Sequence, residues 1–283
     1  MDAGIWPSFS VVIPTFRRHQ QLSECLSCLA PYFDPATKQP VVATLEVIVS
    51  DDANEPELAS LLQQHYPWCR YTPAPGRGPA ANRNHGARQA TAEWLVFTDD
   101  DCLPQPGWLE AYAHHVNRSD VMEGRTAPAG RRTRVDEECP INEHGGYLWS
   151  CNFAINRVLF LQLGGFNEDF PAAAMEDVEL NRRINLAGLK RQFVGTAEVR
   201  HPWRQRKGVG FVRIHSRSIA TYVALHPETG SAFTPPVLFL NLLRSFKASL
   251  RTALVIGSLR GLPRQIGLDI MAAVVTWQAL RHL

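Results

Sequence analysis

Short runs of consecutive apolar residues alternate with segments of helical periodicity in the first 120 residues. The runs 9–14 (FSVVIP), 45–50 (LEVIVS) and 94–98 (WLVFT) are rich in β-branched or aromatic residues, which is typical of buried strands. Four further segments have the apolar spacing of helices: 20–32, 57–66, 80–90 and 106–116. This alternation predicts a mostly parallel α/β sheet with helices on both faces.

The second half of the chain is less regular. Proline and glycine predict loops over 34–42 and 71–79, and a flexible segment over the functional site at 124–146. The remaining pattern predicts a strand or an extended wall over 147–156, a strand over 191–199, and helices over 175–187 and 211–225.

Charge is nearly balanced over the whole chain but not in its tail. The 29 basic and 27 acidic residues give no indication of nucleic-acid binding, and we expect none. The segment beyond residue 230 contains six basic residues and one acidic residue, and its apolar residues between 238 and 250 follow helical spacing. Two interpretations stay open for this basic amphipathic tail: peripheral contact with an anionic membrane, or helices packed on the rest of the chain.

The N-terminal residues and the positions of the cysteines indicate a reducing compartment. The N-terminal MDAGIWPSFS has neither a basic region nor an apolar core, so it is not a signal peptide. No apolar run is long enough for a transmembrane helix. Cys25 and Cys28 share helical spacing with leucines, which favours a core role over a metal or redox site. We therefore expect a cytoplasmic protein, with the inner face of the cell membrane as its one candidate contact.

Polar clusters follow three of the predicted strands. They are Pro14-Thr15, Asp51-Asp52 and Asp99-Asp100-Asp101, and the carboxyl ends of parallel strands meet at one edge of a sheet. Three adjacent carboxylates repel one another unless a cation neutralises them, and oxygen ligands suit Mg²⁺ or Mn²⁺. The alternative is a solvated turn that caps the helix beginning near residue 106.

A second acidic pair lies far along the chain. Glu176 and Asp177 fall in the first turn of a predicted helix, where the helix dipole favours carboxylates. Helix capping alone would explain them. An ionised carboxylate in this position can also serve as a general base.

These motifs together resemble those of family 2 glycosyltransferases, which have the Rossmann-like GT-A fold. Four segments carry the resemblance in the family's order, within roughly residues 9–203: VVIPTFRR (11–18), EVIVSDDAN (46–54), AANRNHGARQATAEWLVFTDDDCLP (80–104) and GGFNEDFPAAAMEDVELNRRINLAG (164–188). The resemblance implies an inverting, metal-dependent transferase that moves a hexose or deoxyhexose from a nucleoside diphosphate sugar to a glycan or lipid-linked acceptor. It also implies three parts: a nucleotide-sugar-binding half (1–120), an acceptor-binding and catalytic half (121–230) and a C-terminal helical extension (231–283).

The resemblance also assigns roles to single residues. The catalytic base would be Asp177, and a divalent cation would be held by Asp101, Asp99 and, in some members, a residue at the position of His201. For His201, an ordinary strand-end histidine is the alternative. The donor-binding residues would be Pro14, Thr15, Arg17, Asp51, Arg83, Asp99 and Asp100.

On the acceptor side, the candidates are Trp149, Asn152 and Glu176. Trp149 could stack on a sugar ring or could simply be a core aromatic.

Three rival functions remain open. A nucleotidyltransferase of similar fold would need a glycine-rich phosphate loop, and VVIPTFRR contains no glycine. A phosphatase with an Asp-x-Asp nucleophile would carry that motif after its first strand, but here two strands precede it. A glycan-binding protein with an inactive transferase fold is disfavoured because Asp99, Asp101 and Asp177 are all present.

Overall fold

The computed structural model describes residues 6–41 and 44–281. The chain forms two compact units. The first, here called the sheet unit, comprises Met1–Ala127, Pro140–Glu168 and Glu176–His201. The second, the helical unit, comprises Pro128–Cys139, Asp169–Met175 and Pro202–Leu283. The three-part division expected at residues 120 and 230 stays a prediction.

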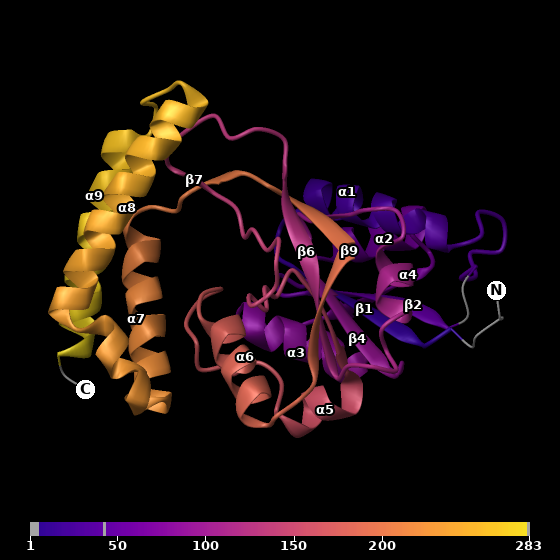
Figure 1. The fold of residues 1–283 in the computed structure, drawn as a ribbon. Helices are drawn as coiled ribbons and strands as arrows, with labels where there is room; N and C mark the ends of the chain where they lie inside the picture. Colours follow the sequence, from indigo (N-terminus) through magenta and orange to yellow (C-terminus); the bar gives the residue numbers. More distant parts are fainter. Residues whose placement is uncertain (1–5, 42–43, 282–283) are drawn as a thin grey trace. The chain divides into compact units, whose positions relative to one another are not determined.

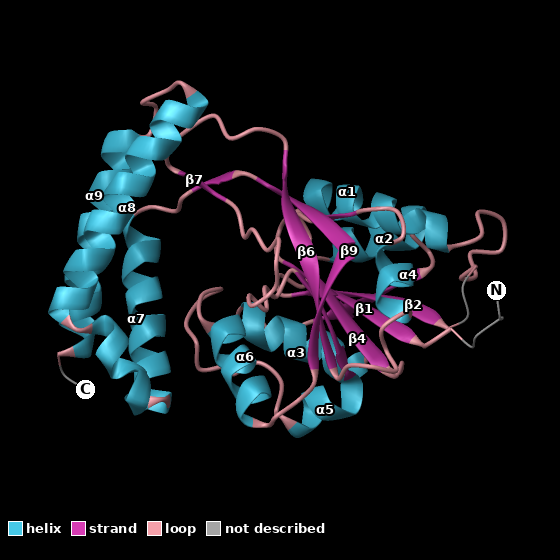
Figure 2. Cartoon of the chain, in the orientation of Figure 1, coloured by secondary structure: helices cyan, strands magenta, loops and turns pink. Residues whose placement is uncertain are grey.

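The sheet unit is built on one eight-stranded sheet in the order β3-β2-β1-β4-β8-β6-β9-β5 (Figures 1 and 2). The four strands from β3 to β4 are parallel, whereas β8 pairs antiparallel with both β4 and β6, and β5 pairs antiparallel with β9. The strand bounds are β1 Phe9–Thr15, β2 Leu45–Asp51, β3 Cys69–Pro73, β4 Trp94–Thr98, β5 Leu103–Pro104, β6 Val121–Ala129, β8 Asn152–Asn156 and β9 Arg191–Pro202.

Helices cover both faces of this sheet, as the alternating pattern predicts. One hydrophobic cluster joins alternate residues of β1, such as Val11 and Ile13, to the first group of helices, and another joins Val12 to the second group. Gly86 lets a helix of the second group lie close to β1, because a Cβ there would come 2.6 Å from Val12 Cγ1. The first group is α1 His19–Leu29, α2 Pro56–His65 and α4 Trp108–Ala113, and the second is α3 Pro79–Gln89, α5 Arg157–Gln162 and α6 Glu176–Leu186.

The helical unit is a layer of three long helices. α9 (Leu262–Leu280) packs against both α7 (Val209–Leu225) and α8 (Pro235–Ile256). The short strands β7 (Glu137–Glu138) and β10 (Arg204–Gln205) pair beside them. Two 3₁₀ turns, η1 (Ala30–Tyr32) in the sheet unit and η2 (Pro227–Phe233) here, complete the elements. Within the described residues, none of the helices has both the length and the apolar character needed to cross a membrane.

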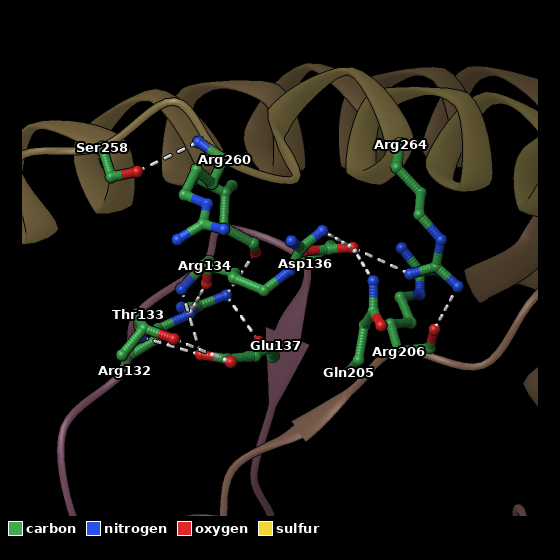
Figure 3. Close-up of polar contacts among 11 residues, drawn as sticks. Arg132, Thr133, Arg134, Asp136, Glu137, Gln205, Arg206, Ser258, Arg260 and Arg264 are labelled. Atoms are coloured by element: carbon green, nitrogen blue, oxygen red, sulfur yellow. Dashed lines mark hydrogen bonds and ion pairs between the residues drawn. The ribbon is translucent and has the colours of Figure 1, made fainter.

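A buried carboxylate holds the helical unit together (Figure 3). Asp136 has no exposed surface and accepts hydrogen bonds from Arg134 Nε (2.8 Å), Gln205 Nε2 (2.8 Å) and Arg264 Nη1 (2.9 Å). Burial alone would raise the pKa of Asp136, but these hydrogen bonds hold it well below its usual value. Gly261 packs directly on this group, since a Cβ there would lie 1.8 Å from Asp136 Oδ1.

Several predicted elements differ from the structure. The prediction of a loop over 71–79 was wrong for its first three residues, because Tyr71–Pro73 belong to the half-exposed edge strand β3. The prediction of a flexible segment over 124–146 was wrong for residues 124–129, which belong to strand β6 although they include a glycine and a proline. The strand predicted over 147–156 is regular only from Asn152. Cys25 is buried in the core as predicted, but the core role expected for Cys28 was wrong, because that residue is only half-buried. All six cysteines are free thiols.

Candidate active site

The carboxyl ends of three parallel strands bring their polar residues to one edge of the sheet unit. β1 lies between β2 and β4, and Thr15 stands in register with Asp51 at the end of β2. The Thr15 hydroxyl donates a 2.8 Å hydrogen bond to Asp100 Oδ2, just beyond the end of β4. Two of the predicted clusters are therefore in direct contact.

Arg83 on α3 joins the acidic triplet to the second acidic pair. Its side chain is buried, with Nη2 2.6 Å from Asp99 Oδ1 and Nη1 3.2 Å from Glu176 Oε1. Its guanidinium also lies over the ring of Phe166, 5.6 Å from the centroid. Burial alone would lower the pKa of Arg83, but the carboxylates of Asp99 and Glu176 raise it. The arginine thus stays charged and links residues that lie 77 positions apart in the sequence.

Arg18 is the second cation of the site, and sequence reasoning did not single it out. Its Nη1 lies 2.9 Å from Asp100 Oδ1 and 3.1 Å from Asp101 Oδ2. Burial raises the pKa of Asp100 to about 6, although the Arg18 charge opposes this shift. No sequence signal separates Arg18 from its neighbour Arg17, whose exposed side chain lies 3.9 Å from Glu55 and over the ring of Phe16.

A group of possible metal ligands lies next to Arg18. Asp101, Cys102 and His201 each offer one ligand atom, and these atoms lie within 4.8 Å of one another in buried surroundings. His201 Nε2 is 3.4 Å from Asp101 Oδ1. Burial and the neighbouring Cys151 raise the pKa of the Cys102 thiol well above its usual value. Hard divalent cations such as Mg²⁺ and Mn²⁺ prefer oxygen ligands to sulfur, so the Asp101 carboxylate and the His201 imidazole suit them better than Cys102 does.

Glu176 and Asp177 lie in the first turn of α6, as predicted, and the structure places Glu176 beside Arg83. Burial raises the pKa of Glu176 to about 7, and the Asp177 charge adds to this effect. Glu176 Oε2 is buried and has no hydrogen-bond partner among the described residues. Burial also raises the pKa of Asp177, against the opposing influence of Arg83 and of the backbone groups of Val178 and Ser150. Both carboxylates are therefore poised to take up a proton more readily than exposed ones.

The remaining donor-side candidates have structural partners in the same region. Asp51 accepts hydrogen bonds from the backbone of Ala53 (2.9 Å) and Glu55 (2.7 Å) and from the Tyr71 hydroxyl (3.1 Å). Pro14 is buried in β1. Arg17 has a left-handed backbone with φ +55°, which is uncommon for a residue with a side chain and is often found at functional loops.

Two of the acceptor-side candidates, Trp149 and Asn152, lie just before β8 and at its first residue. Trp149 stacks on Tyr147 with ring centroids 5.5 Å apart, and Tyr147 is 58% exposed. Ser150 directly follows Trp149, and its backbone forms a hydrogen bond with Asp177. By contrast, the amide of Asn152 is buried and donates to the carbonyls of Arg125 (2.7 Å) and Ala197 (2.9 Å). Asn152 thus anchors the sheet, and its role toward an acceptor stays a prediction.

Hydrogen bonds join helix α3 to the Gly-Gly-Phe turn at residues 164–166, about 80 positions later in the sequence. Asn84 Nδ2 donates to the Phe166 carbonyl (2.8 Å), and Asn84 Oδ1 accepts from the Phe166 backbone (2.9 Å). Gly165, with φ +69°, lies so close that a Cβ would come 2.4 Å from Asn84 Oδ1. The Arg-Asn pair on α3 therefore fixes the Gly-Gly-Phe turn that precedes α6.

The chain is similar in sequence to known glycosyltransferases. It is 27% identical over 173 residues to a pre-mycofactocin glycosyltransferase of Mycobacterium tuberculosis, covering 54% of this chain and 36% of that protein. It is 31% identical over 185 residues to a GalNAc(5)-diNAcBac-PP-undecaprenol beta-1,3-glucosyltransferase of Campylobacter jejuni, covering 58% and 56%. The chain thus spans roughly a third to a half of the length of such relatives.

The fold is also that of solved transferases. A mannosyltransferase from Pyrobaculum calidifontis, determined in complex with GDP-Man and Mn²⁺, matches with a TM-score of 0.60 at 18% identity, covering 97% of this chain and 88% of that one. The sheet unit accordingly has the GT-A architecture expected from its motifs. The model of the family named Glycosyl transferase family 2 matches residues 10–156, just over half of the chain. The chain belongs to glycosyl transferase family 2.

Proposed function

We propose that this protein is an inverting, metal-dependent glycosyltransferase. It would transfer a hexose or deoxyhexose from a nucleoside diphosphate sugar to a hydroxyl of a glycan or lipid-linked acceptor. One observation carries the proposal: Arg83 connects Asp99, at the end of β4, to Glu176, the residue directly before Asp177. Arg83 thereby holds a candidate metal-site carboxylate close to the residue that precedes the candidate base, which supports one site that serves both donor and acceptor.

The donor would lie along the carboxyl edge of the parallel strands. Pro14, Thr15, Arg17 and Asp51 would line the base and ribose, and Arg83, Asp99 and Asp100 would face the ribose and diphosphate. The family relationship supports this placement, as does the similar mannosyltransferase that binds GDP-Man. Open α/β sheets bind nucleotides at this edge for a general reason, since loops and helix N-termini converge there.

A divalent cation would be held by Asp101 and His201, with Asp99 nearby. The buried carboxylate and imidazole fit such an ion, and an oxygen and nitrogen donor set suits Mn²⁺ better than Mg²⁺. When bound, the ion would supply Lewis-acid neutralisation of the charge that develops on the departing diphosphate. Arg18 holds the opposite side of Asp101 and adds positive charge to the same region.

Asp177 would act as the general base. The acceptor oxygen would form a bond to the anomeric carbon while the bond from that carbon to the phosphate oxygen breaks. The proton of the acceptor hydroxyl would pass to Asp177, and the bonding electron pair would leave with the nucleoside diphosphate. The raised pKa of Asp177 strengthens it as a base, and one displacement from the opposite face inverts the anomeric centre.

The acceptor would approach from the side of Trp149. Its ring and that of Tyr147 form a stacked pair beside Ser150, and aromatic faces commonly pack against the apolar faces of sugars. Glu176, whose pKa of about 7 leaves it partly protonated near neutral pH, could donate a hydrogen bond on this side. Asn152 would contribute by fixing β8.

The test is a donor screen with product analysis. UDP-, GDP- and TDP-sugars would be incubated with the purified chain, Mn²⁺ and simple glycan or lipid-linked acceptors. We expect one donor class to give a glycosylated acceptor whose new anomeric configuration, read by proton NMR, is opposite to that of the donor. A retained configuration would overturn the inverting mechanism. Nucleotide binding without any transfer across the panel would favour a glycan-binding protein with an inactive fold.

A further inference from the structure

One side of helix α8 in the helical unit packs on α9, and the rest does not. Only two α8 residues are fully buried, Ser249 and Ala253. Ser245, one turn earlier on the same face, donates to Asp269 Oδ2 on α9 (2.6 Å). These small residues allow close packing along one narrow face, so most of the helix surface is left to other contacts.

An apolar stripe runs along α8 next to that packed face. Its members are three or four residues apart and therefore lie on one side of the helix. They are large and exposed: Phe239 (61%), Leu243 (50%), Phe246 (43%), Leu250 (40%) and Leu254 (82%). Two more large apolar residues are exposed nearby: Val255, on another side of α8 (86%), and Leu259, in the turn after the helix (69%). Soluble proteins rarely expose a contiguous apolar surface of this kind without a partner.

A row of cations borders the stripe on its far side. Arg244, Lys247 and Arg251 are all exposed, and α8 contains no acidic residue. The single acid beyond residue 230 is Asp269, which is engaged by Arg206 and Ser245. The exposed side of α8 thus combines large apolar side chains with unopposed positive charge.

We propose that α8 lies flat on an anionic phospholipid bilayer. Phe239, Leu243, Phe246, Leu250 and Leu254 would enter the boundary between headgroups and acyl chains. Arg244, Lys247 and Arg251 would extend along the surface to the lipid phosphates. Each cation near an anionic membrane adds to binding. A lipid surface is complementary to both features of the helix.

A second copy of the chain fits this face less well. A symmetric contact between two α8 helices would place the same three cations of each copy beside those of the other. Such like charges would oppose association at low ionic strength. The charge of the helix therefore selects an anionic partner.

The proposal can be tested by sedimentation of the full chain with vesicles, without donor or acceptor. The test is therefore independent of the proposed transferase reaction. We expect binding to vesicles of phosphatidylglycerol and phosphatidylcholine, weak binding to phosphatidylcholine alone, and release by high salt. The triple variant Leu243→Asn, Phe246→Asn and Leu250→Asn should bind on the order of tenfold more weakly to the anionic vesicles.

A second variant tests the charged edge. Arg244→Gln, Lys247→Gln and Arg251→Gln together should reduce binding to anionic vesicles on the order of tenfold or more, with little change on neutral vesicles. Matched controls lie on the sheet unit. They are Val158→Asn with Leu161→Asn, which are exposed apolar residues of α5, and Arg70→Gln with Arg77→Gln and Arg88→Gln, which are exposed basic residues.

Two results would overturn the proposal. One is equal vesicle binding by the wild type, both variants and the controls. The other is a wild-type dimer in sedimentation velocity that the stripe variant dissociates, combined with no vesicle binding, which would assign the stripe to a second copy. Circular dichroism of the variants would verify the fold, which these exposed positions should leave intact.

Discussion

The two units each contain a cluster of carboxylates and arginines, but the clusters differ in their balance of charge. In the helical unit, Asp136 and Glu137 are surrounded by Arg132, Arg134 and Arg264. Donors satisfy both acids, and the pKa of each is lowered despite burial. This cluster is complete and needs nothing from outside the chain.

In the candidate active site of the sheet unit, the contacts among the described residues involve more carboxylates than arginines. Five carboxylates share Arg18 and Arg83: Asp99, Asp100, Asp101, Glu176 and Asp177. Here burial raises the pKa of Asp100, Glu176 and Asp177. Burying a carboxyl group that lacks enough compensating contacts lowers the free energy of unfolding. The contrast indicates that the first cluster holds the fold together, whereas the second can recruit a cation and exchange a proton.

The largest expected effect is the loss of turnover in Asp177→Asn. The amide cannot take the acceptor proton, so kcat should fall on the order of 10²–10⁴-fold, while the affinity for the nucleoside diphosphate sugar stays the same. Steady-state kinetics and isothermal calorimetry would measure the two quantities. An Asp177→Asn variant with near wild-type kcat would remove this residue from the role of base.

The second-largest expected effect is a loss of stability in the Asp136 cluster of the helical unit. Gly261→Ala should lower the free energy of unfolding by roughly 2–4 kcal/mol, since it combines a left-handed backbone with a collision against Asp136. Gly257→Ala is the matched control: its φ is also positive, but its Cβ would meet open space. Urea unfolding of both variants would separate the collision from the backbone strain. Equal losses would mean that Asp136 can move aside.

Asp136→Asn should cost roughly 2–3 kcal/mol at neutral pH, because it weakens several charge-assisted hydrogen bonds. The pKa of Asp136 is lowered in the folded state, so its contribution is complete above the usual value of 3.8 and is lost as pH falls through the folded pKa. The difference from wild type should therefore shrink in acid. Urea unfolding at neutral pH and near pH 3 would check this, and a difference that grows in acid would contradict it.

The smallest expected effect is on the affinity of the candidate active site for Mn²⁺, which depends on the balance between its carboxylates and its arginines. Arg18→Gln removes the cation that lies 3.1 Å from Asp101, so Mn²⁺ should bind roughly threefold to tenfold more tightly. Arg88→Gln, on the same unit but paired with Glu168, should leave the affinity unchanged. Electron paramagnetic resonance of free Mn²⁺ would measure both. Weaker binding by Arg18→Gln would instead make Arg18 a supporting residue of the metal site.

Most of the sheet unit could be predicted from the sequence because its central strands are buried on both faces. β1, β2 and β4 appear as runs of mainly apolar residues, interrupted only by Ser10 and Glu46 before their polar ends, and such runs carry a strong local signal. β3 was missed because it is a half-exposed edge strand that ends in Pro73. β6 was missed because Gly124 and Pro128 look like loop residues. Gly124 has a packing reason, since a Cβ there would lie 2.3 Å from Asn152 Nδ2.

The acids of the candidate site could also be predicted, because they follow strands or open a helix. The pairing of each acid with its partner could not, even where the partner, such as Arg83, was itself a candidate. Arg18 contacts Asp101, 83 positions away, and in the helical unit Arg264 likewise reaches Asp136 across 128 positions. No periodicity or local spacing encodes such pairs, which depend on how the whole unit folds.

The most direct test of this account is Mn²⁺ binding in the presence of a nucleoside diphosphate, compared between Asp101→Asn and Asp136→Asn. Both variants lose one buried carboxylate, but from different clusters. We expect Asp101→Asn to weaken Mn²⁺ binding at least roughly tenfold, whereas Asp136→Asn, verified as folded, should bind Mn²⁺ as the wild type does. Wild-type affinity in Asp101→Asn would contradict the claim that the acids at the strand ends hold the cation.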